Sequence, residues 1–322
     1  MPRAIIIGSS GQDGTILFRK LQLLGFEVLG ISKETTQSTL DEYANCKVNI
    51  CNKEDVFDMV KHFQADHIYH LAAYHHSSGE IIDDEECAIL KKSLEVNVLT
   101  LHYLLESVTL YSNNSSIFYA ASSHVFGNTE SEIQTEETPF APINYYAISK
   151  AAGVDLCRYY RKKNSLSIAV GIMYNHESIY RNEEFVSIRI IKGALDILYK
   201  KKNELVLGDL EARVDWGSAY DYVDAMYILL KHKVSDDFII ATGVQHSVKD
   251  FVEIVFDYLG LDYRDHVIET KNLVTKRRDN LSGNIAKIQD RVDWKPKTTF
   301  KKMIIDIVDY YEKNEYVTKH NT

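Results

Sequence analysis

Two short stretches of the sequence carry side chains that could move protons. Ser122 closes a strand-like run over 117–121, while Tyr146 and Lys150 stand four residues apart in a segment with a helical pattern. Because residues four apart share one helical face, we expect the Lys150 ammonium to lie beside the Tyr146 phenol and to lower its pKa from ~10. Tyr146 is then a candidate general base near neutral pH. Ser122 is placed to hydrogen-bond the same substrate hydroxyl.

A glycine turn follows the first predicted strand. Residues 4–7 are apolar and largely β-branched, which is typical of a strand buried on both faces of a parallel sheet. They lead into Gly8, Gly11 and Gly14 and then into a helical pattern that ends near residue 24. The spacing differs from the usual G-x-G-x-x-G, but strand, glycine turn and helix are the context of a dinucleotide site, where the helix N-terminus faces the pyrophosphate.

The end of the second predicted strand bears on the choice of cofactor. Residues 27–31 are followed by Ser32, Lys33 and Glu34. An acidic residue here favours NAD through the ribose hydroxyl, whereas a cation accommodates the 2′-phosphate of NADP. Lys33 could meet a phosphate, but Glu34 would repel one. We therefore favour NAD(H) over NADP(H).

The order of the elements predicts the fold class. Further strand-like runs lie at 48–50, 67–71, 117–121 and 167–171, and helical patterns lie at 54–63, 85–108 and 145–162. This alternation predicts an α/β protein with a Rossmann-type doubly wound parallel sheet. After residue 173 the rhythm changes, with helices expected near 185–200, 221–232, 248–259, 284–291 and 300–313 and strands at 205–207 and 238–241. We expect a cofactor-binding domain over 1–174 plus about 215–242, and a smaller, interwoven nucleotide-sugar domain over about 175–214 and 243–322.

Composition excludes several functional classes. The 322 residues are 45% hydrophobic and 26% charged, which is ordinary for a globular protein. A net charge of −9 argues against a nucleic-acid partner. No apolar run approaches ~18 residues, and the start of the chain does not read as a signal peptide, so we expect no membrane association. The cysteines form no C-x-x-C pair and read as reduced thiols of a cytoplasmic protein; they are Cys46, Cys51, Cys87 and Cys157. Four histidines lack partners at ligand spacing, so no metal is expected; they are His67, His70, His75 and His76.

Several stretches resemble a known family. The glycine turn with Gln12-Asp13-Gly14, the Ser122…Tyr146…Lys150 set and a series of later segments are similar to the GDP-mannose 4,6-dehydratases, which belong to the extended short-chain dehydrogenase/reductase superfamily. The later segments are 175–178, 208–212, 215–217, 221–226, 241–248 and 294–298. The resemblance implies a Rossmann domain, a smaller substrate domain and a GDP-sugar substrate. It also implies that Tyr146 deprotonates the C4 hydroxyl while hydride leaves C4 for the nicotinamide.

Binding residues are predicted along the same lines. The residues predicted to bind the cofactor are Gly8, Ser10, Gly11, Gln12, Asp13, Gly14, Ser32, Lys33, Asn49, Ile50, Leu71, Ala72, Ala73, Tyr146 and Lys150. The resemblance implies that Asn175 contacts the diphosphate, that Val186 and Arg189 contact the guanosine, and that His76 lies near the active site. The predicted substrate-binding set is His76, Ser123, Asn175, Val186, Arg189, Gly208, Arg213 and Arg278.

Three departures from the family pattern affect the expected chemistry. The family has a glutamate where this chain has His124, and that glutamate takes the C5 proton and returns one at C6. The family arginine before Asp215 is replaced by Val214, so Arg213, Arg277 or Arg278 is expected to meet the diphosphate. The paired arginines after the second strand are replaced by Lys33 and Glu34.

These departures leave several reactions open. Oxidation at C4 needs only Ser122, Tyr146 and Lys150, whereas dehydration also needs a base at C5 and an acid at C6. The leading interpretation is a GDP-sugar oxidoreductase that converts the C4 hydroxyl to a ketone, on a GDP-mannose or GDP-manno-heptose type of substrate. The alternatives are a 4,6-dehydratase that uses His124 as acid and base, an epimerase, and a non-catalytic cofactor-binding regulator. Apolar faces on the helices near 85–110 and 145–163 predict a homodimer or homotetramer.

Overall fold

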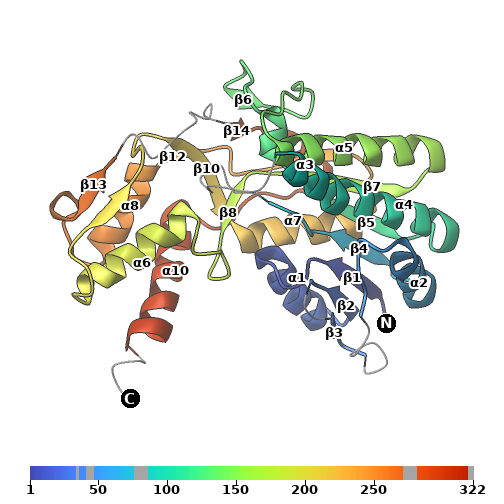
Figure 1. Ribbon diagram of the computed structural model, residues 1–322, viewed down its shortest axis with the longest axis horizontal. Coiled ribbons are helices and arrows are strands. Elements are labelled where there is room, and N and C mark those ends of the chain that lie inside the picture. The colour runs from blue at the N-terminus through green and yellow to red at the C-terminus, as the bar shows by residue number, and fades with distance from the viewer. Residues whose placement is uncertain (34–35, 41–46, 76–85, 271–280, 318–322) are drawn as a thin grey trace.

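A seven-stranded sheet organises the larger part of the molecule (Figure 1). The computed structural model describes residues 1–33, 36–40, 47–75, 86–270 and 281–317. In spatial order the strands are β11 (Asp237–Ile240), β7 (Ser167–Met173), β5 (Ser116–Ser122), β4 (His67–His70), β1 (Arg3–Ile7), β2 (Glu27–Ile31) and β3 (Thr36–Ser38). All neighbours pair in parallel except β2 and β3, which are antiparallel. The predicted α/β class with a doubly wound parallel sheet is confirmed.

Helices cover both faces of this sheet, which explains the unbroken apolar runs of its central strands. In β1, Ala4, Ile5 and Ile6 are fully buried. One face packs against α1 (Gln12–Leu23) and α7 (Ala219–Lys231). The other packs against α2 (Lys53–Phe63), α4 (Thr100–Tyr111) and α5 (Tyr145–Asn164). The carboxyl ends of the parallel strands therefore meet at one edge, between the two helix layers.

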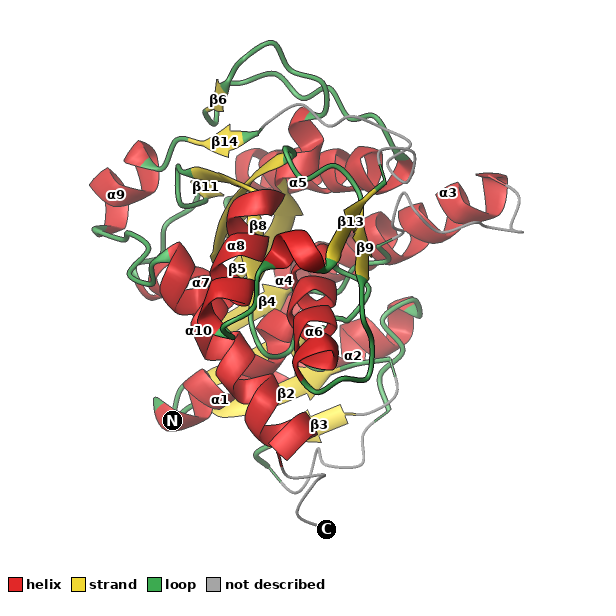
Figure 2. Cartoon of the chain, turned by 90° about the vertical axis from the view of Figure 1, so that its left-hand side faces the viewer, coloured by secondary structure: helices red, strands yellow, loops and turns green. Residues whose placement is uncertain are grey.

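A second, smaller part contains its own core. Its three-stranded sheet has the order β12 (Gln245–Ser247), β10 (Arg213–Ser218), β8 (Asn175–Glu177), and a two-stranded sheet joins β13 (Val267–Glu269) to β9 (Leu205–Leu207). Figure 2 shows the helices of this part in front: α6 (Val186–Leu198), α8 (Val248–Tyr258) and α10 (Phe300–Tyr311), which share one apolar cluster. Further elements are α9 (Ala286–Val292) and the short pair β6 (Ile133–Gln134) with β14 (Ser282–Gly283). The described residues also include 3₁₀ turns (Ser123–Phe126 and Tyr263–Asp265) and a π-helical segment (Glu312–Val317). β10 and β12 belong to the small sheet, whereas α7 and β11, which lie between them in the chain, pack on or belong to the large sheet. We therefore propose that the larger part comprises the chain before β8 and the segment from α7 to β11, and that the remainder forms the smaller part.

The strand expected at residues 48–50 is wrong. The segment is irregular and leads into a turn before α2. The backbone N–H of Asn49 donates to the Asp55 carboxylate (2.8 Å), and the Asn49 side chain accepts from the N–H of Cys51 (3.1 Å). Short polar side chains that bond nearby backbone groups compete with sheet pairing. Asn49, at the centre of this run, therefore favours a turn more strongly than Val48 and Ile50 favour a strand.

The long helix expected over 85–108 is interrupted. It consists of α3 (Glu86–Leu94), a π-helical turn (Glu95–Leu99) and α4. A π-turn inside a helix is rare and occurs frequently at functional sites. Asn97 lies within this turn and is fully buried.

The start of α1 is tied to β8 in the smaller part. Gln12 donates to the carbonyl of His176 (3.0 Å) and accepts from the hydroxyl of Ser178 (2.8 Å). Both carboxylate oxygens of Asp13 lie 3.0 Å from Nε2 of His176. Burial alone would lower the pKa of His176, but the adjacent Asp13 carboxylate raises it above its ordinary value. Burial likewise would raise the pKa of Asp13, and the His176 charge and hydrogen bond lower it. The contact between His176 and Asp13 joins the two parts beside the glycine turn, and each partner favours the charged form of the other.

None of the helices within the described ranges is both long and apolar enough to cross a membrane.

Candidate active site

The predicted catalytic residues meet where β5 ends and α5 begins. Ser122 is the last residue of β5, and its hydroxyl lies close enough to the phenol of Tyr146 to lower the pKa of that phenol. The side chain of Asn144 caps α5 by accepting from the N–H of Ala147 (2.8 Å), which starts the helix so that Tyr146 lies in its first turn. Lys150, one turn later, places Nζ 5.8 Å from the centre of the Tyr146 ring. The structure therefore brings Ser122, Tyr146 and Lys150 together.

The predicted electrostatic role of Lys150 is wrong in this structure. Its Nζ donates to the carbonyl of Ala120 (2.7 Å), and the side chain is buried. Burial lowers the pKa of Lys150 to about 7. Burial also raises the pKa of Tyr146, against the opposing effects of the Ser122 hydrogen bond and the Arg181 charge. The expectation that Lys150 lowers the pKa of Tyr146 considered only the spacing of the two residues, and it omitted the cost of removing both from water.

Two imidazole rings flank Tyr146. The ring of His124 lies 5.7 Å from that of Tyr146, centre to centre, and nearly perpendicular to it. The ring of His75 is closer, at 4.8 Å, and packs edge to face. His76, which the resemblance placed near the active site, lies outside the described residues. His75 was considered in the sequence only as a possible metal ligand, and the doubled histidine after β4 was the signal that could have found it.

A metal site is not supported by the other histidines either. His70 is fully buried, and its Nε2 contacts the hydroxyl of Thr100 (2.9 Å). His67 contacts the hydroxyl of Tyr69 through Nδ1 (3.2 Å). In the part of the chain that the structure describes, no three His, Cys, Asp or Glu side chains are grouped so that they could hold a metal ion.

The glycine turn has the shape that a dinucleotide requires. Gly8 has φ of +99°, and a Cβ there would lie 2.6 Å from the N of Ala72. A Cβ on Gly14 would lie 2.1 Å from the carbonyl oxygen of Gly8, so α1 packs on the turn with no room for a side chain. Gly11 precedes α1 without a side-chain cap. The first backbone N–H groups of α1 are thus available to bind an anion such as a pyrophosphate.

The remaining predicted cofactor residues lie along the same edge of the sheet. Ser10 is in the glycine turn and Gln12 and Asp13 open α1; Ser32 and Lys33 follow β2; Asn49 and Ile50 precede α2; Leu71, Ala72 and Ala73 follow β4. The N–H groups of Leu71 and Ala72 both donate to the carbonyl of Ile7 (2.8 Å each), which holds the β4 end beside the glycine turn. Ligands of open α/β sheets bind outside the carboxyl ends of the strands. The residues therefore fit a nicotinamide dinucleotide. Glu34, which bears on the choice between NAD and NADP, lies outside the described residues.

The predicted substrate residues lie on several elements of the smaller part and on the loop after β5. Ser123 follows Ser122 and is buried. Asn175 opens β8, Val186 opens α6, Gly208 follows β9 and Arg213 opens β10. Arg189, on α6, is exposed and donates to the carbonyl of Val206 (3.4 Å). Arg213 is also exposed and donates to the carbonyl of Gln245 (3.3 Å). Arg277 and Arg278 lie outside the described residues.

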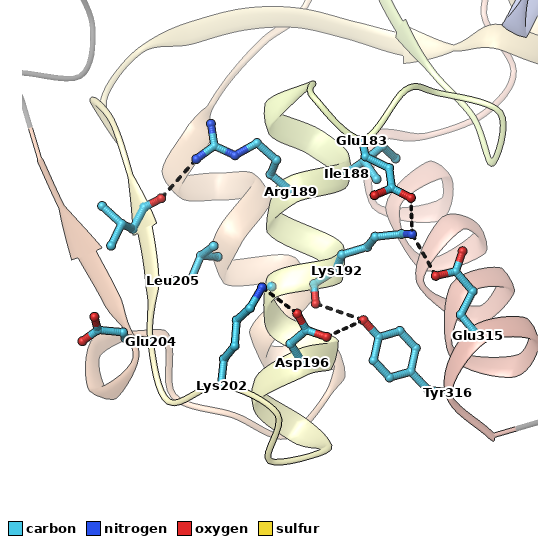
Figure 3. Close-up of a pocket in the computed structure, with 12 residues that line it drawn as sticks. Glu183, Ile188, Arg189, Lys192, Asp196, Lys202, Glu204, Leu205, Glu315 and Tyr316 are labelled. Carbon is cyan, nitrogen blue, oxygen red and sulfur yellow. Dashed lines mark hydrogen bonds and ion pairs between the residues drawn. The ribbon is translucent and has the colours of Figure 1, made fainter. Parts of the chain in front are cut away.

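Arg189 also lines a pocket of about 520 Å³ between α6, β9 and the C-terminal segment (Figure 3). Lys192 in this pocket bonds Glu183 (2.5 Å) and Glu315 (2.8 Å). Asp196 accepts from the hydroxyl of Tyr316 (2.8 Å) and pairs with Lys202. Because neither Ser122 nor Tyr146 lines this pocket, it is not the centre of the chemistry.

Arg181 is a site residue that sequence reasoning missed. Its guanidinium stacks on the ring of Phe185, 3.4 Å from the ring centre, and forms an ion pair with Glu177 (3.3 Å). Its charge acts on Tyr146 and on Asp13. The arginines that the sequence analysis proposes for the diphosphate all lie later in the chain, at Arg213, Arg277 and Arg278. Arg181 lies three residues beyond the segment 175–178, whose resemblance should have drawn attention to it.

Comparison with known proteins places the chain in a family. The family model for GDP-mannose 4,6-dehydratase matches residues 5–307. GDP-mannose 4,6 dehydratase 1 of Arabidopsis thaliana is 33% identical over 95% of this chain and 88% of that protein. The GDP-mannose 4,6-dehydratase of Vibrio cholerae is 28% identical over 95% of this chain and 92% of that protein.

Solved structures confirm the fold. The structure of RMD from Pseudomonas aeruginosa complexed with NADPH has a TM-score of 0.82 at 20% identity and covers 97% of this chain and 99% of that one. The dTDP-glucose 4,6-dehydratase of Bacillus anthracis in complex with NAD has a TM-score of 0.81 at 23% identity and covers 98% of both chains. At these identities the solved structures show the fold alone. The family is shown by the family model over residues 5–307 and by the relative that is 33% identical. The chain belongs to the GDP-mannose 4,6-dehydratase family.

Proposed function

We propose that the protein is an NAD(P)-dependent GDP-sugar oxidoreductase that oxidises the C4 hydroxyl of the sugar to a ketone. Its substrate class is GDP-mannose or a GDP-manno-heptose. The observation that carries the proposal is the composition of the site: the Ser122 hydroxyl acts on the Tyr146 phenol and lowers its pKa, while the position of the family's dehydration glutamate holds His124 beside them.

The chain's own residues supply the proton chemistry. The Ser122 hydroxyl acts on the Tyr146 phenol, so the two oxygens are close enough to converge on one substrate hydroxyl. Tyr146 accepts the C4 hydroxyl proton as general base once its own proton has left, a loss that Ser122 and the Arg181 charge favour against the effect of burial on the pKa of the phenol. The residues of the glycine turn would hold a nicotinamide dinucleotide at the carboxyl edge of the sheet, and its ring would supply the acceptor for the C4 hydride. Lys150 joins α5 to β5, because its Nζ donates to the carbonyl of Ala120.

Dehydration would require two further groups, a base at C5 and an acid at C6. The turn from Ser122 to Phe126 contains no carboxylate. Asp13 is an acidic group whose charge reaches Tyr146, but both of its oxygens are engaged with His176. One observation favours the second candidate, a 4,6-dehydratase: the His124 imidazole lies against Tyr146, and histidine can serve as acid and base near neutral pH.

The first prediction concerns the proton acceptor. Tyr146→Phe should lower turnover by about 10²–10⁴-fold, because it removes the group that takes the C4 hydroxyl proton. Binding of GDP and of the cofactor should change by only a few fold, since the phenol oxygen is the only atom lost. Steady-state kinetics with GDP-sugars, paired with calorimetric binding of GDP, measure both. Near-normal turnover in this variant would remove Tyr146 from the mechanism.

The second prediction concerns the position of the family glutamate. Oxidation at C4 acidifies the C5 proton, so elimination then needs a correctly placed base and acid. His124→Glu should therefore yield some 6-deoxy-4-keto product from a substrate with a C6 hydroxyl, detectable by mass spectrometry. The matched control is His124→Gln, which restores no carboxylate and should give only the ketone. If His124→Glu also gives only the ketone, the carboxylate alone does not determine the outcome.

The third prediction concerns the cofactor. We infer NAD(H) over NADP(H), because a glutamate follows Lys33 where the family has paired arginines. Nucleotide extracted from the purified protein should lack a 2′-phosphate. Lys33→Arg combined with Glu34→Arg should shift the preference toward NADP(H). An extracted nucleotide with a 2′-phosphate would refute the inference.

The fourth prediction concerns assembly. We propose at least a dimer, built on α3, the π-helical turn and α5. These segments expose apolar side chains, namely Leu94, Leu99, Ile148 and Tyr159. Faces of this kind pair across a two-fold axis in many oligomers. Light scattering should give at least twice the mass of one chain, and Tyr159→Glu with Ile148→Glu should reduce it. A single-chain mass for the wild type at micromolar concentration would contradict this proposal.

A further inference from the structure

His75 is held against the catalytic tyrosine although neither the family pattern nor the sequence reasoning gave it a role. Its ring packs edge to face on Tyr146, with ring centres 4.8 Å apart, and lies 6.0 Å from the ring of Phe185. His75 is exposed, whereas His124 on the other side of the phenol is half-buried. His75 is therefore the more solvent-accessible of the two imidazole rings beside Tyr146.

The backbone beside His75 is fixed by a buried amide. Asn97, in the π-helical turn, accepts from the N–H of Tyr74 through Oδ1 (2.7 Å) and donates to the Tyr74 carbonyl through Nδ2 (3.1 Å). Both backbone groups of Tyr74 are thus held by one side chain. The Tyr74 ring is also covered by Nζ of Lys92, 4.6 Å from its centre.

The same amide is linked to the backbone of Tyr146. Nδ2 of Asn97 donates to the hydroxyl of Ser149 (2.8 Å), and this hydroxyl donates to the carbonyl of Tyr146 (2.8 Å). Asn97 thus bonds the backbone of Tyr74, which precedes His75. Through Ser149 it is also linked to the backbone of Tyr146, on which His75 packs. The local departure from α-helical geometry at 95–99 places that amide, and a departure of this kind is characteristic of functional sites.

The surroundings leave Tyr146 in need of a route to water. Lys150, the neighbouring amine, is buried and donates to the Ala120 carbonyl. The charged and titratable groups that the described residues place around His75 and Tyr146 are His124, Arg181, Asp13 and Lys150. Asp13 is paired with His176, and Arg181 is a permanent cation stacked on Phe185. Burial lowers the pKa of Lys150 to about 7, but its amine is held inside the protein, so an exposed histidine is the better route for a proton to water.

We propose that His75 carries the proton of Tyr146 to solvent in each turnover, and that Asn97 holds it in place. The inference rests on the proposed C4 oxidation. The O–H bond at C4 breaks and its proton binds the phenolate oxygen of Tyr146, while the two electrons of the C–H bond leave as the hydride described above. The proton then passes from the phenol to a ring nitrogen of His75, directly or through one water, and from there to bulk water. Tyr146 is thereby restored as a base. Because His75 acts through Tyr146, it is a positioning residue in the strict sense.

The kinetic test compares His75→Ala with His75→Gln. Both should lower kcat by about 10²-fold with KM changed by only a few fold, because neither alanine nor glutamine relays a proton. Imidazole added to His75→Ala should restore turnover, and a series of substituted imidazoles should restore it in proportion to their basicity. Glutamine keeps the size and hydrogen-bonding capacity of histidine, so wild-type turnover in His75→Gln would overturn the proposal. Equal rescue by every imidazole would also overturn it, since it would indicate simple space filling.

The design separates this proposal from the proposed function. Wild-type protein is assayed in parallel for reduction of the nicotinamide by GDP-sugars. If the wild type reduces it and His75→Ala does so equally fast, the role of His75 fails while C4 oxidation stands. If no GDP-sugar leads to reduction in the wild type, the proposed function fails with it.

A second measurement needs no turnover. The Cε1–H resonance of His75 is assigned in the NMR spectrum of the whole protein as the signal that disappears in His75→Gln. Tyr146→Phe should shift the titration midpoint of this resonance, because it removes the hydroxyl with which the imidazole exchanges a proton. Asn97→Ala should broaden the resonance by releasing Tyr74. A His75 titration that is unaltered by Tyr146→Phe would contradict the proposed coupling.

Discussion

The juxtaposition of Ser122 and Tyr146 is the constraint on which the site depends. It joins the last residue of a buried central strand to the first turn of a helix that packs on the same sheet. Neither partner can move without moving a main element of the fold, because β5 lies between β4 and β7 and α5 is capped at Asn144. The rigidity of the sheet thereby fixes the two oxygens that the proposed mechanism places against the substrate hydroxyl. Catalytic groups held in this way need little reorganisation during the reaction.

Burial determines the electrostatics of this site more strongly than pairing does. Lys150 and Tyr146 are adjacent on one helical face, yet the pKa of the amine falls to about 7 and the pKa of the phenol rises. Both shifts have the same cause, because each charged form loses its hydration. A base of this kind depends on its polar neighbours for proton exchange. The replacement of a carboxylate by His124 and the presence of His75 surround the phenol with groups that exchange protons at neutral pH.

The sequence was sufficient where a residue's role depends on periodicity or on a local turn. The apolar run at 4–7, the glycines around Gly11 and the i, i+4 spacing of Tyr146 and Lys150 each predicted an element or a juxtaposition that the structure contains. Prediction was insufficient where the outcome depends on long-range contacts. Asn97 bonds Tyr74 and Ser149 from a π-helical turn that helical periodicity does not reveal, and Arg181 reaches the site through its stack on Phe185. The run at 48–50 was misread because the side chains of Asn49 and Asp55 satisfy its backbone locally.

The central claim is that the reaction ends at the C4 ketone. The most direct test is the mass spectrum of the product that the wild-type protein forms in D2O from a GDP-manno-configured sugar with its C6 hydroxyl intact. The account predicts a product that has lost two hydrogen atoms, retains the C6 oxygen and carries no deuterium at C5. A product that has lost the elements of water and gained deuterium would contradict the account and identify the protein as a dehydratase.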